Sequence, residues 1–558
     1  MRKIIYALTI AILLLNSAKG QTPQWIWAKY GLHTSYTEGF AACIDSDGNA
    51  YLSGFFNGNT LVFGNTTIVN SDNTSSTFDI FIVKYDASGN LQWAKSAAGP
   101  GADDWCYDIT CDESGNVILT GFFRGSYITF GNVTLTHPGL FVVKFDGEGN
   151  VIWARDAIGS SETRSIVTDV NNNVFITGWF NTSILQFGNI TLNNGGSPAI
   201  KDYFIAKYDS TGTILWAKKG GGIGHDQGMG ISTDLAGNVY VTGDFKSPTI
   251  SFGNTTLTNV NSDSMDVFVA KYDTDGNVLW AKREGGTSSD GGHNIAVSPS
   301  GNVYVVGWYF STSFQYGNNT INRVGPWGVR DMFFSKYDSE GNVMWAKSVV
   351  STYDVYAWSL CLDDYENIFI AGGYGGSVDF GSFNITASGG IDEAFIVKYN
   401  SDGIEQCAFK TLSGGDDYLI IFLDDSGNMF LGGDWGGVSG IGDLPIVGFE
   451  NAFIAKFRFN CEPVTVNNSI VDDCIRIYPN PATTHLTIEM NSLPIAIGNR
   501  TSNYECRIMN TLGQVVLHST LDIRNSTFDI SSISPGLYLL QVFDNKGELV
   551  KTEKVVKE

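Results

Sequence analysis

Acidic side chains recur at the same position of a repeated pattern in this sequence of 558 residues. An acid stands 12 residues before the asparagine of a repeated Asp-x-x-Gly-Asn turn, or a close variant of it, at Asp104, Asp226, Asp290 and Asp416. The acids Glu38, Glu162 and Asp354 stand one residue out of that register. On a closed ring of repeats, such carboxylates would surround one opening and attract a cation or a basic or polar ligand. The alternative is that each accepts hydrogen bonds from its own loop and so serves only the repeat.

Aromatic residues supply a second candidate surface. Several follow the second strand of a repeat, namely Trp179, Trp308, Trp327 and Trp435. Rings in such loops can stack on sugars, and they equally fill the space between packed sheets. No catalytic set is identified, because the sequence has no Ser/His/Asp or Cys/His order and no HExxH motif.

Calcium is an open alternative at two turns. The segments Asp45-Ser46-Asp47 and Asp273-Thr274-Asp275 resemble the start of a calcium-binding loop. Neither is followed by the bidentate glutamate of an EF-hand. The sequence therefore predicts no cofactor and assigns no metal ligand.

The elements that must position these side chains are repeats. Trp-Ala-Lys or Trp-Ala-Arg begins at Trp27, Trp93, Trp153, Trp216, Trp280 and Trp345. Between these markers, as in residues 231–282, each unit has an apolar strand, a turn, a second strand, a Phe-Gly-Asn segment, a Lys-Tyr-Asp strand, a second turn and the Trp-Ala-Lys strand. This order predicts four short strands a unit, with Gly-Asn at the hairpin corners.

The repeats predict an all-β fold, a seven-bladed β-propeller followed by a small Ig-like β-sandwich. The lysine of the Lys-Tyr-Asp strand occurs seven times, at Lys84, Lys144, Lys207, Lys271, Lys336, Lys398 and Lys456. The last unit lacks its Trp-Ala-Lys strand, and residues 24–29 form an unattached one. We expect the first strand to complete the last blade and so to close the ring, which removes two exposed strand edges.

The repeat resembles a known family, the bacterial SBBP β-propeller repeats. The segment Val239 to Asp290 carries the pattern VYVTG, DVFVAKYD, Gly-Asn-x-x-Trp and Gly-Gly-x-x-x-Asp. The resemblance covers about residues 24–460. It implies a fold and no particular chemistry.

The ends of the chain predict export. Residues 1–20 have the basic start, apolar run and small-residue cleavage site of a signal peptide, and no other stretch reads as a membrane helix. A formal net charge of −23 excludes nucleic acid as a partner. Eight cysteines show no regular spacing, and the pairs Cys106 with Cys111 and Cys461 with Cys474 are merely close enough in sequence to bond.

The last part of the chain reads as a separate domain. A linker at 461–474 separates the propeller at 21–460 from residues 475–558, which alternate apolar and polar residues. The motifs there resemble the type A sorting domain of the type IX (Por) secretion system, found in Bacteroidota. They are Tyr478, Pro479, Asn480 and Pro481, then Gly513, then Pro535, Gly536 and Tyr538. The resemblance implies transport across the outer membrane by the type IX machinery. An ordinary Ig-like adhesion module is the alternative.

These features predict a secreted or cell-surface protein. We expect a non-enzymatic binding or adhesion module for an extracellular glycan or protein, because a rigid scaffold presents variable loops. The alternatives are a carbohydrate-active hydrolase or lyase with an acidic site at the channel mouth, and a passive surface-layer protein.

Overall fold

The computed structural model divides the chain into two compact units, Met1–Cys461 and Glu462–Glu558. It describes residues 23–33, 35–72, 76–317, 319–323, 326, 328–387, 393–410, 419–424, 427–435, 451–459, 475–478, 482–490, 504–510, 515–521, 525–543 and 549–557. The predicted signal peptide and linker lie outside these residues. The two units are considered one at a time.

The described part of the first unit contains seven sheets built alike, each with four antiparallel strands in the order innermost, second, third and outer. The innermost strands are β3 (Thr37–Ile44), β9 (Asp104–Cys111), β15 (Ser161–Thr168), β21 (Asp226–Thr233), β27 (Asp290–Val297), β33 (Val355–Leu362) and β39 (Leu419–Leu423). The second strands are β4 (Ala50–Phe56), β10 (Val117–Phe123), β16 (Val174–Phe180), β22 (Val239–Phe245), β28 (Val303–Tyr309), β34 (Ile368–Tyr374) and β40 (Met429–Trp435).

The third strands carry the Lys-Tyr-Asp motif. They are β7 (Asp79–Tyr85), β13 (Gly139–Phe145), β19 (Asp202–Tyr208), β25 (Asp266–Tyr272), β31 (Asp331–Tyr337), β37 (Glu393–Tyr399) and β41 (Asn451–Arg458). The outer strands are β8 (Leu91–Ala97), β14 (Val151–Asp156), β20 (Ile214–Gly220), β26 (Val278–Glu284), β32 (Val343–Ser351), β38 (Glu405–Lys410) and, from the start of the chain, β1 (Gln24–Tyr30).

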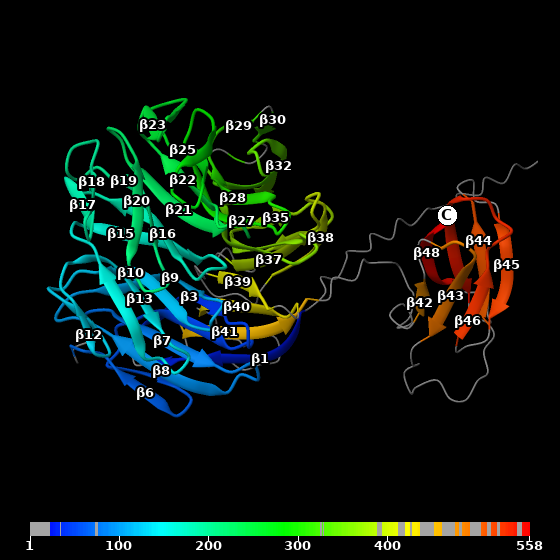
Figure 1. Cartoon of the computed structure of the whole chain (residues 1–558), viewed down its shortest axis with the longest axis horizontal. Coiled ribbons are helices and arrows are strands. Elements are labelled where there is room, and N and C mark those ends of the chain that lie inside the picture. The colour runs from blue at the N-terminus through cyan, green and yellow to red at the C-terminus, as the bar shows by residue number, and fades with distance from the viewer. Residues whose placement is uncertain are drawn as a thin grey trace, which may run out of the picture. The chain divides into compact units, whose positions relative to one another are not determined.

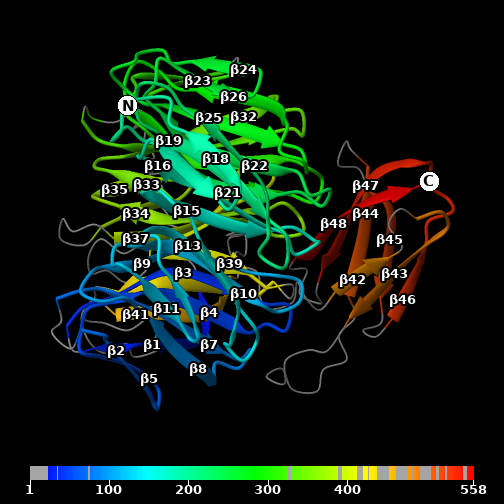
Figure 2. The ribbon, with the colours of Figure 1, turned by 60° about the vertical axis from the view of Figure 1, so that its left-hand side comes forward.

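The predicted closing strand is confirmed. Strand β1 pairs antiparallel with β41 and completes the sheet β1-β41-β40-β39. The two strands lie side by side in Figures 1 and 2. Each innermost strand contacts the innermost strand of the next sheet, and β39 contacts β3. The contacts therefore close a circle, which gives a β-propeller-like all-β fold.

The middle strands form the core. Every residue of β4, β10, β16, β22 and β25 is buried, because each of these sheets packs between two neighbours. Strands covered on both faces read as continuous apolar runs rather than as alternating ones, as in VFITGWF of β16.

The first four sheets are each clamped to the next by the tryptophan and the lysine of the repeat. The indole of Trp93 and the ammonium of Lys84 both donate to the carbonyl oxygen of Gly147, a turn residue of the next sheet, at 3.0 and 3.1 Å. Trp216 and Lys207 hold Thr274 in the same way. The motifs Trp-Ala-Lys and Lys-Tyr-Asp therefore recur because each unit needs them to bind its neighbour.

The same lysines balance the negative charge of the aspartate in the first turn of their own sheet. Lys144 lies 2.6 Å from the carboxylate of Asp112, and both side chains are buried. In the fifth sheet Ser298 replaces this aspartate. Glu366, from the turn of the sixth sheet, instead reaches Lys336 at 3.1 Å and Tyr304 at 2.6 Å. The charge of the buried lysine is thus balanced even where the repeat departs from its pattern.

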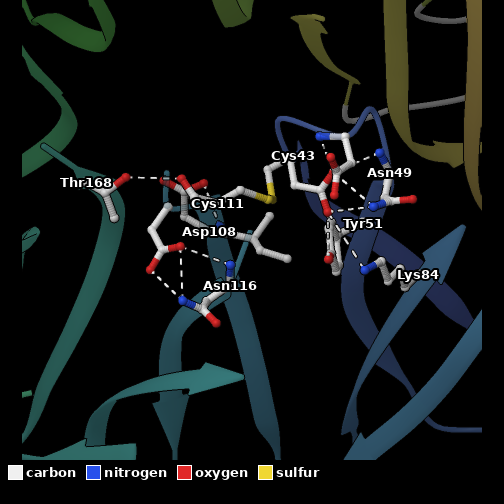
Figure 3. Close-up of a disulfide and its surroundings, with 12 residues drawn as sticks. Cys43, Asn49, Tyr51, Lys84, Asp108, Cys111, Asn116 and Thr168 are labelled. Atoms are coloured by element: carbon white, nitrogen blue, oxygen red, sulfur yellow. Dashed lines mark hydrogen bonds and ion pairs between the residues drawn. A yellow bond between two sulfur atoms is a disulfide. The ribbon is translucent and has the colours of Figure 1, made fainter. Parts of the chain in front are cut away.

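Two features differ from the sequence predictions. Cys111 bonds to Cys43 across the innermost strands of two sheets, with their Cα atoms 6.2 Å apart (Figure 3). Cys106 is a buried free thiol. The suggested pairing of Cys106 with Cys111 is wrong, because Cys106 points into the core between the sheets while Cys111 stands at the turn end of β9.

The Phe-Gly-Asn segments add hairpins to the four-stranded units. They are β5 (Thr60–Phe63) with β6 (Thr66–Val69), β11 (Ile128–Phe130) with β12 (Val133–Leu135), β17 (Ile184–Phe187) with β18 (Ile190–Asn193), β23 (Thr249–Phe252) with β24 (Thr255–Thr258), β29 (Ser313–Tyr316) with β30 (Asn319–Asn322), and β35 (Ser377–Asp379) with β36 (Asn384–Thr386). The first hairpin also pairs with β2 (Leu32–His33), and the last pairs with β32. The first hairpin therefore pairs with the short strand that follows the outer strand β1, and the last hairpin pairs with the end of the outer strand β32.

The second unit has two antiparallel sheets, ordered β42-β43-β46 and β45-β44-β47-β48. Its strands are β42 (Ile475–Tyr478), β43 (His485–Met490), β44 (Tyr504–Met509), β45 (Val515–Leu521), β46 (Asn525–Asp529), β47 (Gly536–Phe543) and β48 (Leu549–Lys557). In the described part of the whole chain, no helix has the length and apolar character needed to span a membrane.

The clamp predicts a large effect for one buried lysine. Lys144→Met leaves the carboxylate of Asp112 buried without its cation, so the free energy of unfolding should fall by about 3–5 kcal/mol. Arg124→Met is the matched control, because the Arg124–Asp103 pair spans 3.9 Å with the arginine 59% exposed. Its loss should be below ~1 kcal/mol. Urea unfolding measures both, and equal small losses would contradict the clamp.

Candidate ligand-binding site at the ring axis

A β-bulge interrupts six innermost strands at the same place. In each strand one extra residue stands opposite the paired second strand: Phe40, Tyr107, Arg164, Met229, His293 and Trp358. A bulge leaves its extra residue outside the ladder and redirects the side chain. We call these six residues the axial cluster.

The axial side chains converge from different sheets. The rings of Phe40 and Tyr107 lie 5.4 Å apart, and the guanidinium of Arg164 lies 4.4 Å from the centre of the Tyr107 ring. The rings of His293 and Trp358 lie 5.2 Å apart. Burial, aided by the charge of Arg164, lowers the pKa of His293 to about 4, so this imidazole is neutral at physiological pH.

Cations lie over aromatic rings near the loops that lead into the innermost strands, which we call the leading loops. Lys201 Nζ is 4.0 Å from the ring centre of Trp179, and Arg330 is 5.1 Å from that of Tyr356. Arg124 lies over both Phe122 and Trp105. In these pairs the cation lies over a ring, and the rings of Trp179, Tyr356 and Phe122 are themselves buried.

Several buried donors in this region have no hydrogen-bond partner among the described residues. They are the ring nitrogens of Trp105 and Trp179 and Nε of Arg164. Buried polar groups are nearly always hydrogen-bonded, so donors of this kind are suited to the oxygen atoms of a ligand.

The region also contains carboxylates. Glu162 pairs with Arg164 at 3.1 Å. Asp244 accepts a hydrogen bond from Gln227, and burial raises the pKa of Asp244 to about 7. Burial, followed by the nearby charge of Arg164, lowers the pKa of Lys201. The site therefore offers aromatic faces, donors and acceptors together.

The predicted acids Asp104, Asp226 and Asp290 begin β9, β21 and β27, and each is fully buried. The carboxylate of Asp226 accepts hydrogen bonds from the amides of Gly222 and Ser247 and from the Ser247 hydroxyl. Asp290 is held in the same way. In this position they brace the leading loops, while a role in binding stays a prediction. Asp416 lies outside the described residues.

The predicted aromatics fall into two groups. Trp179 and Trp308 lie on the second strands β16 and β28, opposite Glu162 and Gly291. Trp179 is buried and Trp308 is half-buried. Trp435 is the last residue of β40, and its side chain, like the whole of Trp327, lies outside the description.

The turns suggested for calcium are occupied by their own hydrogen bonds. The carboxylate of Asp45 accepts from the amide of Asp47, the side chain of Asn49 and the hydroxyl of Tyr51. Asp273 accepts likewise from Asp275 and Asn277. These aspartates therefore shape their hairpins.

In the second unit, the hydroxyl of Tyr538 donates to the carbonyl oxygen of Ser534, which holds the exposed Pro535 and Gly536 at the start of β47. Tyr478 ends β42. The remaining motif residues Pro479, Asn480, Pro481 and Gly513 lie outside the described residues.

Comparison with known proteins identifies this second unit. Residues 476–558 match the family described as the secretion system C-terminal sorting domain, the Por tail. The chain is therefore an exported protein with a β-propeller-like fold. It is delivered to the cell surface or the extracellular space by the type IX system, whose machinery its C-terminal domain engages.

Two curated relatives carry less information. An uncharacterized WD repeat-containing protein of Acanthamoeba polyphaga mimivirus is 25% identical over 432 residues, which is 64% of this chain and 31% of the relative. The regulatory protein FlaEY of Caulobacter vibrioides is 28% identical over 183 residues, 33% of this chain and 18% of its own. The chain thus spans about a third or less of these curated relatives.

Solved structures show only distant likeness. Sqt1 from Chaetomium thermophilum is 10% identical with a TM-score of 0.36, covering 78% of this chain and 90% of its own. PorZ, a surface component of the type IX secretion system of Porphyromonas gingivalis, is 10% identical with a TM-score of 0.17, covering 95% and 100%. At such scores neither structure bears on the function of this chain.

The buried acids predict an unusual pH dependence. Burial raises the pKa of Asp290 to about 7, well above its ordinary value. The folded state therefore binds this proton more tightly than the unfolded state, so the contribution is complete below about pH 4 and is lost as pH rises through 7. The free energy of unfolding of the native chain, relative to that of Asp290→Asn, should fall over that range by roughly 4 kcal/mol. Urea unfolding at pH 4 to 8 measures it, and a difference independent of pH would contradict it.

Proposed function

We propose that this chain is an exported seven-bladed β-propeller protein that binds an extracellular glycan or protein at the axial cluster, without catalysis. The seven four-stranded sheets and the closing strand support the blade count. The observation that carries the proposal is the bulge repeated in six innermost strands, since bulges redirect side chains and are common next to functional sites.

The composition of the cluster favours recognition of a polar ligand with flat faces. Phe40, Tyr107 and Trp358 supply rings, Arg164 and the neighbouring Lys201 supply cations, and Glu162 and Asp244 supply carboxylates. The bulged residues differ from sheet to sheet, although the strands that carry them repeat. Variation confined to one set of positions on a constant scaffold is expected of a binding surface.

The remaining sequence predictions complete the proposal. We infer a signal peptide at 1–20, SBBP-type repeats over 21–460, a linker at 461–474 and an Ig-like sandwich over 475–558, in a bacterium of the Bacteroidota. The two sheets of the second unit support the sandwich. A route through the type IX system would place the axial cluster outside the cell, where it can meet its ligand.

A glycan array with the full chain tests the proposal. Trp105→Ala removes a ring beside Tyr107 and a buried donor, and Arg164→Gln removes the central cation. Each should weaken binding of an array hit roughly tenfold or more, equivalent to about 1.4 kcal/mol. Tyr365→Ala is the control, because this ring is 84% exposed on the turn between β33 and β34.

Two results would contradict the proposal. One is glycan binding that is unchanged in Trp105→Ala and in Arg164→Gln but lost in Tyr365→Ala. The other is cleavage of the bound glycan, read as new reducing ends, which would turn Glu162 and Asp244 into candidate catalytic acids.

A further inference from the structure

Buried acids at the start of the third strands are paired with cations. Asp202 lies 3.0 Å from Lys219, Asp266 lies 3.1 Å from Arg283, and Glu393 lies 3.4 Å from Lys410. Asp331 lies 3.4 Å from Arg323. In the second and seventh sheets Gly139 and Asn451 stand at this position, so no charge needs balance there. In the third to sixth sheets, each buried acid at this position therefore has one cation beside it.

The strand register fixes where that cation comes from. Lys219 pairs with Phe204, Arg283 with Phe268 and Lys410 with Phe395, each two residues after the acid on the third strand. In the first sheet the residue paired with Phe81 is Ser96. Asp79 is therefore the exception: among the described residues, it is the third-strand acid with no Lys or Arg within 4 Å.

A second carboxylate faces Asp79 across the interface. The amide of Asp104 donates to the carbonyl oxygen of Phe78 at 2.8 Å, which brings Asp104 beside Asp79. Both side chains are buried, at 0% and 1% exposure. The two carboxylates are close enough for the charge of Asp79 to act on Asp104.

Asp104 also lacks the hydroxyl that its counterparts receive. Ser247 donates to Asp226 at 2.6 Å and Ser311 to Asp290 at 2.7 Å. Gly125 stands at the equivalent place, two residues after the second strand β10. Oδ1 of Asp104 has no hydrogen-bond partner among the described atoms, although it is fully buried.

Oxygen atoms surround the space that this serine would fill. A Cβ atom built on Gly125 would lie 3.3 Å from the carbonyl oxygen of Tyr127 and 3.4 Å from that of Pro100. The amide and hydroxyl of Ser71 contact the carboxylate of Asp79 at 2.6 and 3.1 Å. Arg124, which precedes Gly125 in the chain, is exposed and pairs with Asp103.

We propose that a hard metal cation of the calcium class binds between Asp79 and Asp104, in place of the lysine or arginine of the other sheets. Two carboxylates and main-chain carbonyls form an oxygen-rich set of the kind that calcium prefers. The site differs from both turns that resemble calcium loops in the sequence. It is independent of the axial cluster, so it stands or falls apart from the proposed binding function.

Calcium titration of the full chain by isothermal calorimetry tests the proposal. The native chain should bind one equivalent with a dissociation constant on the order of 0.1–1 mM, the range of extracellular calcium modules. Asp79→Asn should lose that equivalent. Ser96→Lys should lose it as well, because this lysine supplies the cation that Lys219 supplies in the third sheet. The Ser96→Lys variant should also have a melting temperature in EDTA at or above that of the native chain.

The control is Gln92→Lys, which adds the same charge on the same strand β8 at an exposed position. It should retain the calcium equivalent. An unchanged stoichiometry in Ser96→Lys, or a native chain with no saturable calcium binding up to 10 times the expected constant, would overturn the proposal. Ser96→Lys decides the question even if Asp79→Asn fails to fold.

Discussion

The structure depends on one contact repeated in the first four sheets, in which an indole and an ammonium group share the carbonyl oxygen of a turn in the next sheet. Trp153 and Lys144 hold Ser210 in this way, as Trp280 and Lys271 hold Ser339. Each of these contacts ties a turn of one sheet to the outer and third strands of the sheet before it, so the sheets support one another around the ring. Trp27, at the start of the described chain, donates to Ala87 and so joins the last sheet to the first.

This arrangement separates stability from recognition. The clamps and the Asp–Lys pairs lie at the turn ends of the innermost strands, and the bulges lie toward the leading loops. Substitutions at Phe40, Arg164 or His293 leave the clamp residues untouched. The chain can therefore vary its axial side chains while every sheet keeps the same contact with its neighbour. That division is why we place binding at the axial cluster.

The sequence predicts the repeat, its turns and its closing strand, because each rests on residue types at fixed spacing. The position of β1 follows from a missing Trp-Ala-Lys strand at one end and an extra one at the other. The axial cluster could not be predicted, since a bulge is a property of the pairing between two strands, and Phe40 or Arg164 reads as an ordinary strand residue. The spacing of Asp226 and Asp290 can be read from the sequence, but their burial cannot, because it depends on the neighbouring sheet. The Cys43–Cys111 bond likewise joins residues that only ring closure brings together.

Hydrogen exchange of a closure variant tests the central claim most directly. Ala28→Pro places a proline within β1, opposite Ala455 of β41, where it interrupts the closing pair. If closure holds the ring, amide protection should fall in β39 to β41 and in β3 and β4, on both sides of the closing strand, and not only in β1. Loss of protection confined to residues 24–30, with both neighbouring sheets exchanging as in the native chain, would contradict the account.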